Sequence, residues 1–263
     1  MFDFHTYLNG LMVLAALAVL TWLVSIAKKN VSIVDSMWSL FFLATAITYA
    51  LVSAGQSVTS WGPRTVLVVV LVAVWALRLA IYITTRNLGH AEDPRYVAIR
   101  KRHDPGFALK SLYLVFLLQA LLAWIISMPL LGAILSPLPQ PLGLIDALGA
   151  ALWALGLFFE AVGDWQLARF KRDEANRGQV MDRGLWRYTR HPNYFGDFCV
   201  WWGLYLIAVA GGAWWAVIAP LLMSLLLMRV SGVTLLERTI VRRRPGYEEY
   251  IRRTNAFFPG PPR

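Results

Sequence analysis

Long, uninterrupted apolar runs are the feature that most constrains this 263-residue chain. A helix that spans a membrane needs about 20 apolar residues, whereas the strands of a membrane barrel are short and alternate in polarity. A charged fraction of 15% is also well below the quarter that is usual in soluble domains. The runs therefore predict an all-α integral membrane protein with seven transmembrane helices, near residues 7–27, 33–54, 64–85, 111–135, 143–168, 194–210 and 213–235.

The basic residues predict the orientation of these helices. Apart from Arg64, Arg78 and Arg229, which lies in the second half of the last run, the 25 Lys and Arg residues fall in segments that lie on one side if the seven spans alternate. Basic loops stay in the cytoplasm, so we expect the N-terminus outside and the C-terminus cytoplasmic, in a multi-pass protein of a bacterial inner (plasma) membrane. The net charge of +10 then belongs to a face that meets anionic lipid or an anionic cofactor, and nucleic acid is not an expected partner.

Several other classes of protein are excluded by simple features. The first run follows no basic residue and has no small-residue cleavage site, so it is expected to remain as an anchor. The single cysteine, Cys199, excludes an internal disulfide and a cysteine-based zinc site, and His90 and His103 lack metal-ligand spacing. No repeat or low-complexity tract is visible, which predicts one membrane domain over residues 1–263.

Ionisable side chains within the apolar runs are candidates for function. Asp35 lies about one turn inside the second run, and Trp75 and Arg78 share a face of the third. Such groups are costly in a membrane unless they face a polar interior, and Arg78 needs a partner, for which Asp35 and Glu160 are the candidates. Two structural alternatives stay open: Asp35 supports a helix N-terminus, and Arg78 forms a buried ion pair.

The end of the fifth run carries a polar stripe. Glu160, Asp164 and Lys171 are spaced by four and seven residues, which places them on one side of a helix as it leaves the membrane. Two carboxylates within the apolar part favour a polar cavity over a row of structural ion pairs.

The stretch Gly184–Asp197 gathers Arg187, Arg190 and His191 just before Pro192, which fits the first position of a new helix. A helix start next to arginines favours phosphate, although a basic membrane anchor has the same pattern. The tail after the last run alternates aromatic and charged residues, which is typical either of a segment that folds back over the cytoplasmic face or of a lipid-binding amphipathic tail.

The chain resembles the steroid 5-alpha-reductase family, specifically its bacterial membrane branch, and the similarity extends over nearly all of the chain. The residues that carry the resemblance are Phe159-Glu160, Asp164-Trp165, Phe170-Lys171, Gly184-Leu185-Trp186, Arg190 to Asp197, Trp201-Trp202-Gly203, Asp35 to Trp38 and Gly89 to Tyr96. The His-Pro-Asn-Tyr element is also similar to that of sterol C14 reductases. A looser Arg-His-Pro-x-Tyr occurs in isoprenylcysteine carboxyl methyltransferases.

The resemblance implies NADPH as cofactor and reduction of a C=C bond conjugated to a ketone, as in a 3-oxo-Δ4 steroid. It implies that residues 1–135 are substrate-side helices and that 136–263 bind the cofactor. The residues of this chain that match the family's cofactor-binding positions are Asp164, Lys171, Asn176, Trp186, Arg190, His191, Asn193, Tyr194, Asp197 and Glu237. The steroid enzymes have a Gln-Glu pair and a tyrosine where this chain has Val34-Asp35 and Trp75.

The expected reaction is hydride transfer from NADPH to an enone lipid, with Asp35, Trp75 and Arg78 as the catalytic residues. A donor near the carbonyl oxygen would stabilise its developing charge, and a protonated Asp35 is expected in that role, assisted by Trp75 or Arg78. The rival functions are an S-adenosylmethionine-dependent membrane methyltransferase and a non-catalytic lipid- or sterol-binding protein. The expected partners are a hydrophobic small molecule and membrane lipid, while the sequence leaves the oligomeric state open.

Overall fold

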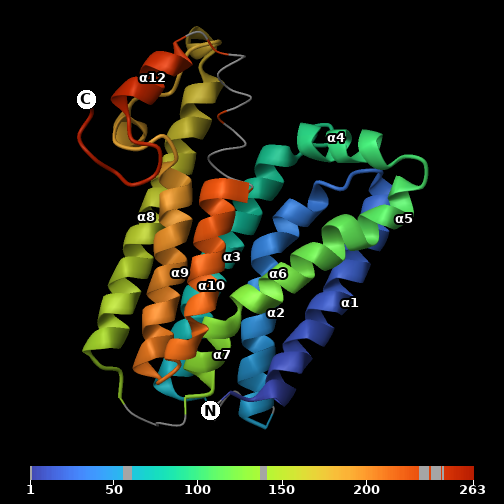
Figure 1. Ribbon diagram of the computed structural model, residues 1–263, viewed down its shortest axis with the longest axis vertical. Coiled ribbons are helices and arrows are strands. Elements are labelled where there is room, and N and C mark those ends of the chain that lie inside the picture. The colour runs from blue at the N-terminus through green and yellow to red at the C-terminus, as the bar shows by residue number, and fades with distance from the viewer. Residues whose placement is uncertain (1, 56–60, 137–140, 231–236, 238–243, 245) are drawn as a thin grey trace. The chain divides into compact units, whose positions relative to one another are not determined.

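A computed structural model describes residues 2–55, 61–136, 141–230, 237, 244 and 246–263. All regular elements in these ranges are helical (Figure 1). The chain forms two compact units: Met1–Gly143 with Ile207–Ala216, and Leu144–Leu206 with Val217–Arg263.

The first unit is built around α2 (Ile33–Ser53), which packs against α1 (Phe4–Lys28), α3 (Pro63–Asn87), α6 (Leu118–Ile126) and α7 (Met128–Ile134). The remaining elements of this unit are α4 (Pro94–His103), α5 (Phe107–Ser111), the π-helical turn η2 (Leu112–Leu117) and η5 (Trp214–Val217), whose last residue belongs to the second unit. Fully buried aromatic rings, Phe41, Phe42 and Tyr49 of α2 and Trp75 of α3, fill the core of this helix group.

The second unit contains α8 (Leu144–Arg172), the turns η3 (Glu174–Asn176) and η4 (Gly184–Arg187), α9 (Pro192–Ala210) up to Leu206, α10 (Ile218–Leu225), η6 (Leu226–Val230) and α12 (Tyr247–Arg253). Helices α8 and α9 are in close backbone contact at two glycines, Gly156 and Gly196. A Cβ atom on Gly196 would lie 2.5 Å from the backbone nitrogen of Glu160, and one on Gly156 would lie 2.5 Å from the Gly196 oxygen. Small residues at such a contact let two membrane helices approach along their backbones.

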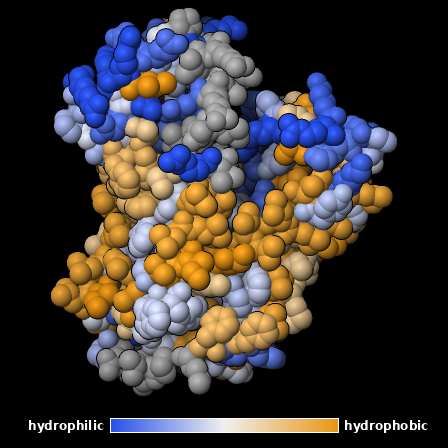
Figure 2. Space-filling model, in the orientation of Figure 1, coloured by the Kyte–Doolittle hydropathy of each residue, from blue (hydrophilic) through white to orange (hydrophobic). Residues whose placement is uncertain are grey.

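Five helical segments among the described residues are long and apolar enough to cross a membrane: Phe4–Lys28, Ile33–Ser53, Pro63–Asn87, Phe107–Ile126 and Leu144–Arg172. Large apolar side chains such as Leu20, Ile81 and Phe158 point outward from them, and Figure 2 shows hydrophobic surface over the helices with hydrophilic surface over α4 and α12. The protein is therefore a multi-pass membrane protein, as the sequence predicts.

The last predicted span has a less regular structure than the sixth. The run at 194–210 corresponds to the 19-residue α9. The run at 213–235 begins as η5, continues as α10 and η6 and is described only to Val230, so its end lies outside the described residues. The fourth predicted span, 111–135, is divided at Ser127. The next helix, α7, begins at Met128 with Pro129 in its first turn, and proline cannot continue the backbone hydrogen bonding of the preceding helix.

Candidate functional site

The first unit holds a cluster of polar side chains around Asp35, at the start of α2. The Tyr96 hydroxyl donates a 2.6 Å hydrogen bond to Asp35 Oδ1, and Arg95 Nη2 lies 2.7 Å from Asp35 Oδ2. Gln119 Nε2 donates to the Tyr96 oxygen at 3.3 Å. We call these four residues, Asp35, Arg95, Tyr96 and Gln119, the Asp35 cluster.

The residues at the start of α4 explain why Arg95 and Tyr96 lie beside Asp35. Asp93 caps α4 by accepting a hydrogen bond from Arg95 N at 2.8 Å, and Pro94 occupies the first turn, where its missing N–H has no cost. The Asp93 N–H in turn donates to Ser32 Oγ at 2.7 Å, and Glu92 Oε1 accepts from Val31 N at 2.8 Å. The connection before α4 is thereby fastened to the residues that precede α2.

Charge stabilises this connection further. Arg100 pairs with Glu92 at 2.8 Å. Burial acts to raise the pKa of Glu92, but the hydrogen bonds from Arg100 and Val31 outweigh it and hold the pKa below its usual value. For Tyr96, burial and the neighbouring Asp35 both raise the pKa well above that of a free phenol. Tyr96 therefore keeps its proton at neutral pH.

The other predicted catalytic residues lie on α3. Trp75 is fully buried, and its ring packs edge-on against Phe42 with the ring centroids 5.8 Å apart. The guanidinium of Arg78 lies over the Tyr82 ring, 5.3 Å from its centroid. Asp35, expected as a partner for Arg78, instead has its ion pair with Arg95. Glu160, the other expected partner, belongs to the second unit.

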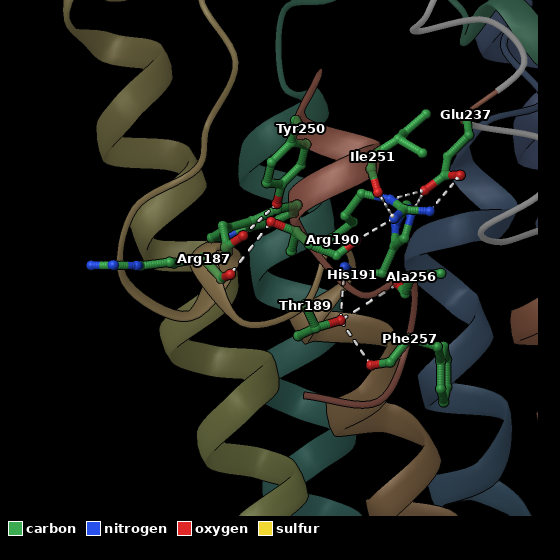
Figure 3. Close-up of polar contacts among 11 residues, drawn as sticks. Arg187, Thr189, Arg190, His191, Glu237, Tyr250, Ile251, Ala256 and Phe257 are labelled. Atoms are coloured by element: carbon green, nitrogen blue, oxygen red, sulfur yellow. Dashed lines mark hydrogen bonds and ion pairs between the residues drawn. The ribbon is translucent and has the colours of Figure 1, made fainter. Parts of the chain in front are cut away.

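The second unit holds a cluster centred on Arg190 (Figure 3). Its Nε and Nη2 atoms bind the two carboxylate oxygens of Glu237 at 2.7 and 3.0 Å. His191 Nε2 lies 3.0 Å from Glu237 Oε1 and donates to it, because an ionised carboxylate can only accept. We call Arg190, His191 and Glu237 the Arg190 cluster. It brings together three residues that the sequence predicts at the cofactor site.

The electrostatics of Glu237 follow from these contacts. Burial alone would raise its pKa, but the hydrogen bonds from His191 and Arg190 outweigh burial and lower the pKa from 4.5 to about 2. Glu237 is therefore ionised at all physiological pH values and neutralises a cation that is 8% exposed.

The C-terminal segment folds back onto the residues before α9. Arg190 Nη1 donates to the carbonyls of Ile251, at 3.2 Å, and Thr254, and Arg190 N donates to Asn255 O at 2.9 Å. Thr189 Oγ1 donates to Phe257 O at 2.7 Å, and Figure 3 shows it pointing toward that carbonyl. The tail therefore folds back over the residues that precede α9.

Most of the remaining predicted cofactor residues lie along α8 and α9. Asn193 donates to Asp164 Oδ1 at 3.3 Å, and the Tyr194 ring stacks on His191 with the centroids 5.5 Å apart. Trp186 is fixed by its indole N–H, which donates to Gly163 O at 3.0 Å. Asp197 is half-buried in α9.

Lys171 and Asn176 lie elsewhere, on a cavity of about 300 Å³ beyond the C-terminal end of α8. Asn176 is anchored there by donating to Phe170 O at 3.1 Å. Of the Glu160, Asp164 and Lys171 stripe, the two carboxylates are buried and the lysine is exposed, as expected for a helix that leaves an apolar layer. The predicted cofactor residues thus form a group near the start of α9 and a second group at the end of α8.

Sequence reasoning missed Arg95, Tyr96, Arg177 and Arg244. Arg95 and Tyr96 lie within the Gly89–Tyr96 stretch that carries part of the family resemblance, and this resemblance could have marked them as site residues. Arg177 and Arg244 have only their charge to mark them, and they lie together on the cavity through the folding of the tail.

Comparisons with known proteins agree with a membrane family. The chain is 25% identical over 283 residues to the uncharacterized protein C594.04c of Schizosaccharomyces pombe, an alignment that covers 98% of this chain and 81% of that protein. No solved structure matches the chain. Residues 21–254 match the family described as "Protein of unknown function (DUF1295)", which is associated with steroid 5-alpha-reductase-like membrane proteins. Since the match extends over most of the chain, the protein belongs to the DUF1295 family.

Proposed function

We propose that this protein is an NADPH-dependent membrane reductase that transfers a hydride to the C=C bond of an enone lipid, such as a 3-oxo-Δ4 steroid. In this proposal the chain crosses a bacterial inner membrane seven times, with its N-terminus outside and its C-terminus in the cytoplasm. The observation that carries the proposal is the 2.6 Å hydrogen bond between the Tyr96 hydroxyl and Asp35.

A buried phenol is suited to the acid step of such a reaction. Reduction of an enone develops negative charge on its carbonyl oxygen, and a donor placed there lowers the barrier. Tyr96 is 6% exposed and retains its proton because burial and Asp35 raise its pKa. Arg95 balances the charge of Asp35, so the carboxylate can hold the phenol without leaving an unpaired ion. Tyr96 has a single O–H, so in the proposed step this O–H turns from Asp35 to the substrate oxygen, and its proton passes to the enolate that hydride transfer forms.

This arrangement changes the roles expected for Asp35 and Trp75. Asp35 lies 2.7 Å from the Arg95 guanidinium and accepts a hydrogen bond from Tyr96, so we assign the donated proton to Tyr96 and the orienting role to Asp35. Trp75 supports α2 from within the core. Arg78 remains a candidate for contact with the substrate.

The residues of the second unit fit an anionic dinucleotide. When bound, NADPH would supply the hydride. Lys171 and Asn176 line a cavity wide enough for part of a nucleotide, and the lining carries additional positive charge. Asn193 and Asp164 offer an amide and a carboxylate for hydroxyl or carboxamide groups, and the Tyr194 ring offers a flat apolar surface.

Ligand-dependent thermal unfolding of the protein purified in detergent tests the cofactor. We expect NADPH to raise the unfolding temperature in a saturable way, and S-adenosylmethionine to have no effect, because binding to the folded state alone stabilises it. Stabilisation by S-adenosylmethionine but not by NADPH would instead support the methyltransferase. The absence of any nucleotide effect would support a non-catalytic lipid-binding protein.

A further inference from the structure

The cavity at the end of α8 has a strongly polar lining. It has a volume of about 300 Å³, and its walls come from the last turn of α8, the turn that follows it and one residue of the tail. The lining residues are Phe170, Lys171, Asp173, Glu174, Asn176, Arg177, Gly178 and Arg244. All of them belong to the second unit.

The two acidic residues of the lining, Asp173 and Glu174, belong to the turn that follows α8. Asp173 accepts a hydrogen bond from Ala175 N at 3.0 Å and so caps η3. The Glu174 carbonyl accepts from Arg177 N at 3.0 Å, which closes the same turn. Gly178, with φ of 83°, then reverses the chain. This turn places Arg177 on the cavity beside Lys171.

Arg244 is brought to the cavity from the far end of the sequence. Its Nη1 atom donates to the Gln179 carbonyl, which lies just after the turn. Two guanidinium groups and one ammonium group therefore line a single cavity, although Arg177 and Arg244 are 67 positions apart in the numbering. Paired guanidinium groups favour phosphate because their planar N–H donors match its oxygens.

Arg190 is the cation that the resemblance places at the cofactor, but its guanidinium donates hydrogen bonds within the protein. Its Nε, Nη1 and Nη2 atoms all donate to Glu237 or to carbonyls of the tail, and its side chain is 8% exposed. Among the described residues, these contacts use four of the five N–H groups of its guanidinium. A phosphate monoester that requires several donors is better accommodated by the cavity.

We propose that this cavity binds the 2′-phosphate of NADPH and that Arg177 and Arg244 are the residues that distinguish NADPH from NADH. The assignment rests on the proposed function, since it names the site of one group of the proposed cofactor. The same chemistry would suit the phosphomonoester headgroup of phosphatidic acid, which is the alternative source of the ligand.

Equilibrium binding to the full-length protein in detergent tests the assignment. The variants are Arg177→Gln, Arg244→Gln and the double variant, and Arg172→Gln is the matched control because it removes a charge from the same helix end without lining the cavity. The probes are NADPH, NADH, 2′,5′-ADP and 5′-ADP. Unchanged unfolding temperatures without ligand establish that the variants fold.

We expect each single variant to bind NADPH and 2′,5′-ADP about tenfold more weakly, with NADH and 5′-ADP unaffected and the control unchanged. Equal weakening of NADPH and NADH, or no weakening, would overturn the assignment while leaving the reductase proposal intact. Binding of phosphatidic acid nanodiscs that depends on Arg177 and Arg244, without binding of 2′,5′-ADP, would assign the cavity to lipid. If the wild type binds no NADPH at all, the proposed function itself fails.

Discussion

Tyr96 and Asp35 lie 61 positions apart in the sequence, and the phenol of one donates a 2.6 Å hydrogen bond to the carboxylate of the other. The contact exists because the connection before α4 is fastened to the start of α2 through Ser32 and Val31. In the proposed reaction this pair holds the proton that reaches the substrate.

Replacing Tyr96 by Phe removes the proposed donor while preserving the ring. We expect the rate of enone reduction to fall by about 10²–10⁴-fold, the range typical of a general acid, with NADPH affinity unchanged. Tyr113→Phe is the matched control, since Tyr113 is 58% exposed in the same unit. An unchanged turnover in Tyr96→Phe would exclude the phenol as donor. The wild-type rate should also not decrease through deprotonation of Tyr96 at any pH below about 10, because the pKa of Tyr96 is raised.

Asp35→Asn tests the orienting role of the carboxylate. We expect turnover to fall while NADPH binding persists, because the amide no longer balances Arg95 or accepts from Tyr96 as strongly. If Asp35 itself donated the proton, Asp35→Asn would abolish turnover and Tyr96→Phe would have little effect. The ratio of the two rate losses therefore separates the two roles.

Glu237→Gln should destabilise the second unit in a pH-dependent manner. The variant leaves Arg190 and His191 without their carboxylate, which costs about 3 kcal/mol for a buried pair. The folded-state pKa of Glu237 is lowered from 4.5 to about 2, so the wild-type advantage is fully present above about pH 4.5 and is lost as pH falls through 2.

Unfolding temperatures measured between pH 7 and pH 2.5 provide the test. The difference between wild type and Glu237→Gln should be largest at neutral pH and should shrink below pH 4.5. Glu248→Gln, which changes an exposed carboxylate of α12, serves as the control and should track the wild type. A difference that stays constant with pH would contradict the ion pair.

Gly196→Ala should separate α8 from α9. The new Cβ would lie 2.5 Å from the Glu160 nitrogen, so one backbone must shift, and overpacking of this kind costs about 1–3 kcal/mol. Gly62→Ala has no atom within 4 Å of the added Cβ and is the control. Equal unfolding temperatures for the two variants would show that the close contact of the helices is absent.

The apolar pattern predicts the individual helices well. The expected spans at 7–27, 33–54, 64–85 and 143–168 correspond to α1, α2, α3 and α8, because a stretch of some 20 apolar residues has few other stable structures in a membrane. The break at Ser127 is harder to predict, since the apolar composition continues across it and only Pro129, in the first turn of α7, marks it. The break at residues 211–212 is predicted, because two glycines separate the last two apolar runs there.

The polar contacts are much less predictable from the sequence. Helical spacing places Trp75 and Arg78 on one face but does not say whether that face meets the core, and Trp75 proves to be core. Arg95 and Tyr96 follow a charged loop that resembles an ordinary solvated segment. They reach Asp35 because hydrogen bonds fasten this loop to Val31 and Ser32, which the sequence does not reveal. The family resemblance gathers Arg190, His191 and Glu237 correctly as neighbours, whereas their mutual pairing required the structure.

The transfer of deuterium from NADPH to a lipid carbon tests the central claim most directly. The purified protein would be incubated with NADPH that carries deuterium at the transferable position of the nicotinamide, together with membrane lipid extract and a panel of enones that includes a 3-oxo-Δ4 steroid. We predict a product three mass units heavier than its enone, with deuterium bound at the β-carbon and ordinary hydrogen at the α-carbon. At the same protein concentration, Tyr96→Phe should form this product about 10²–10⁴-fold more slowly. The absence of carbon-bound deuterium from every lipid and enone tested would contradict the account.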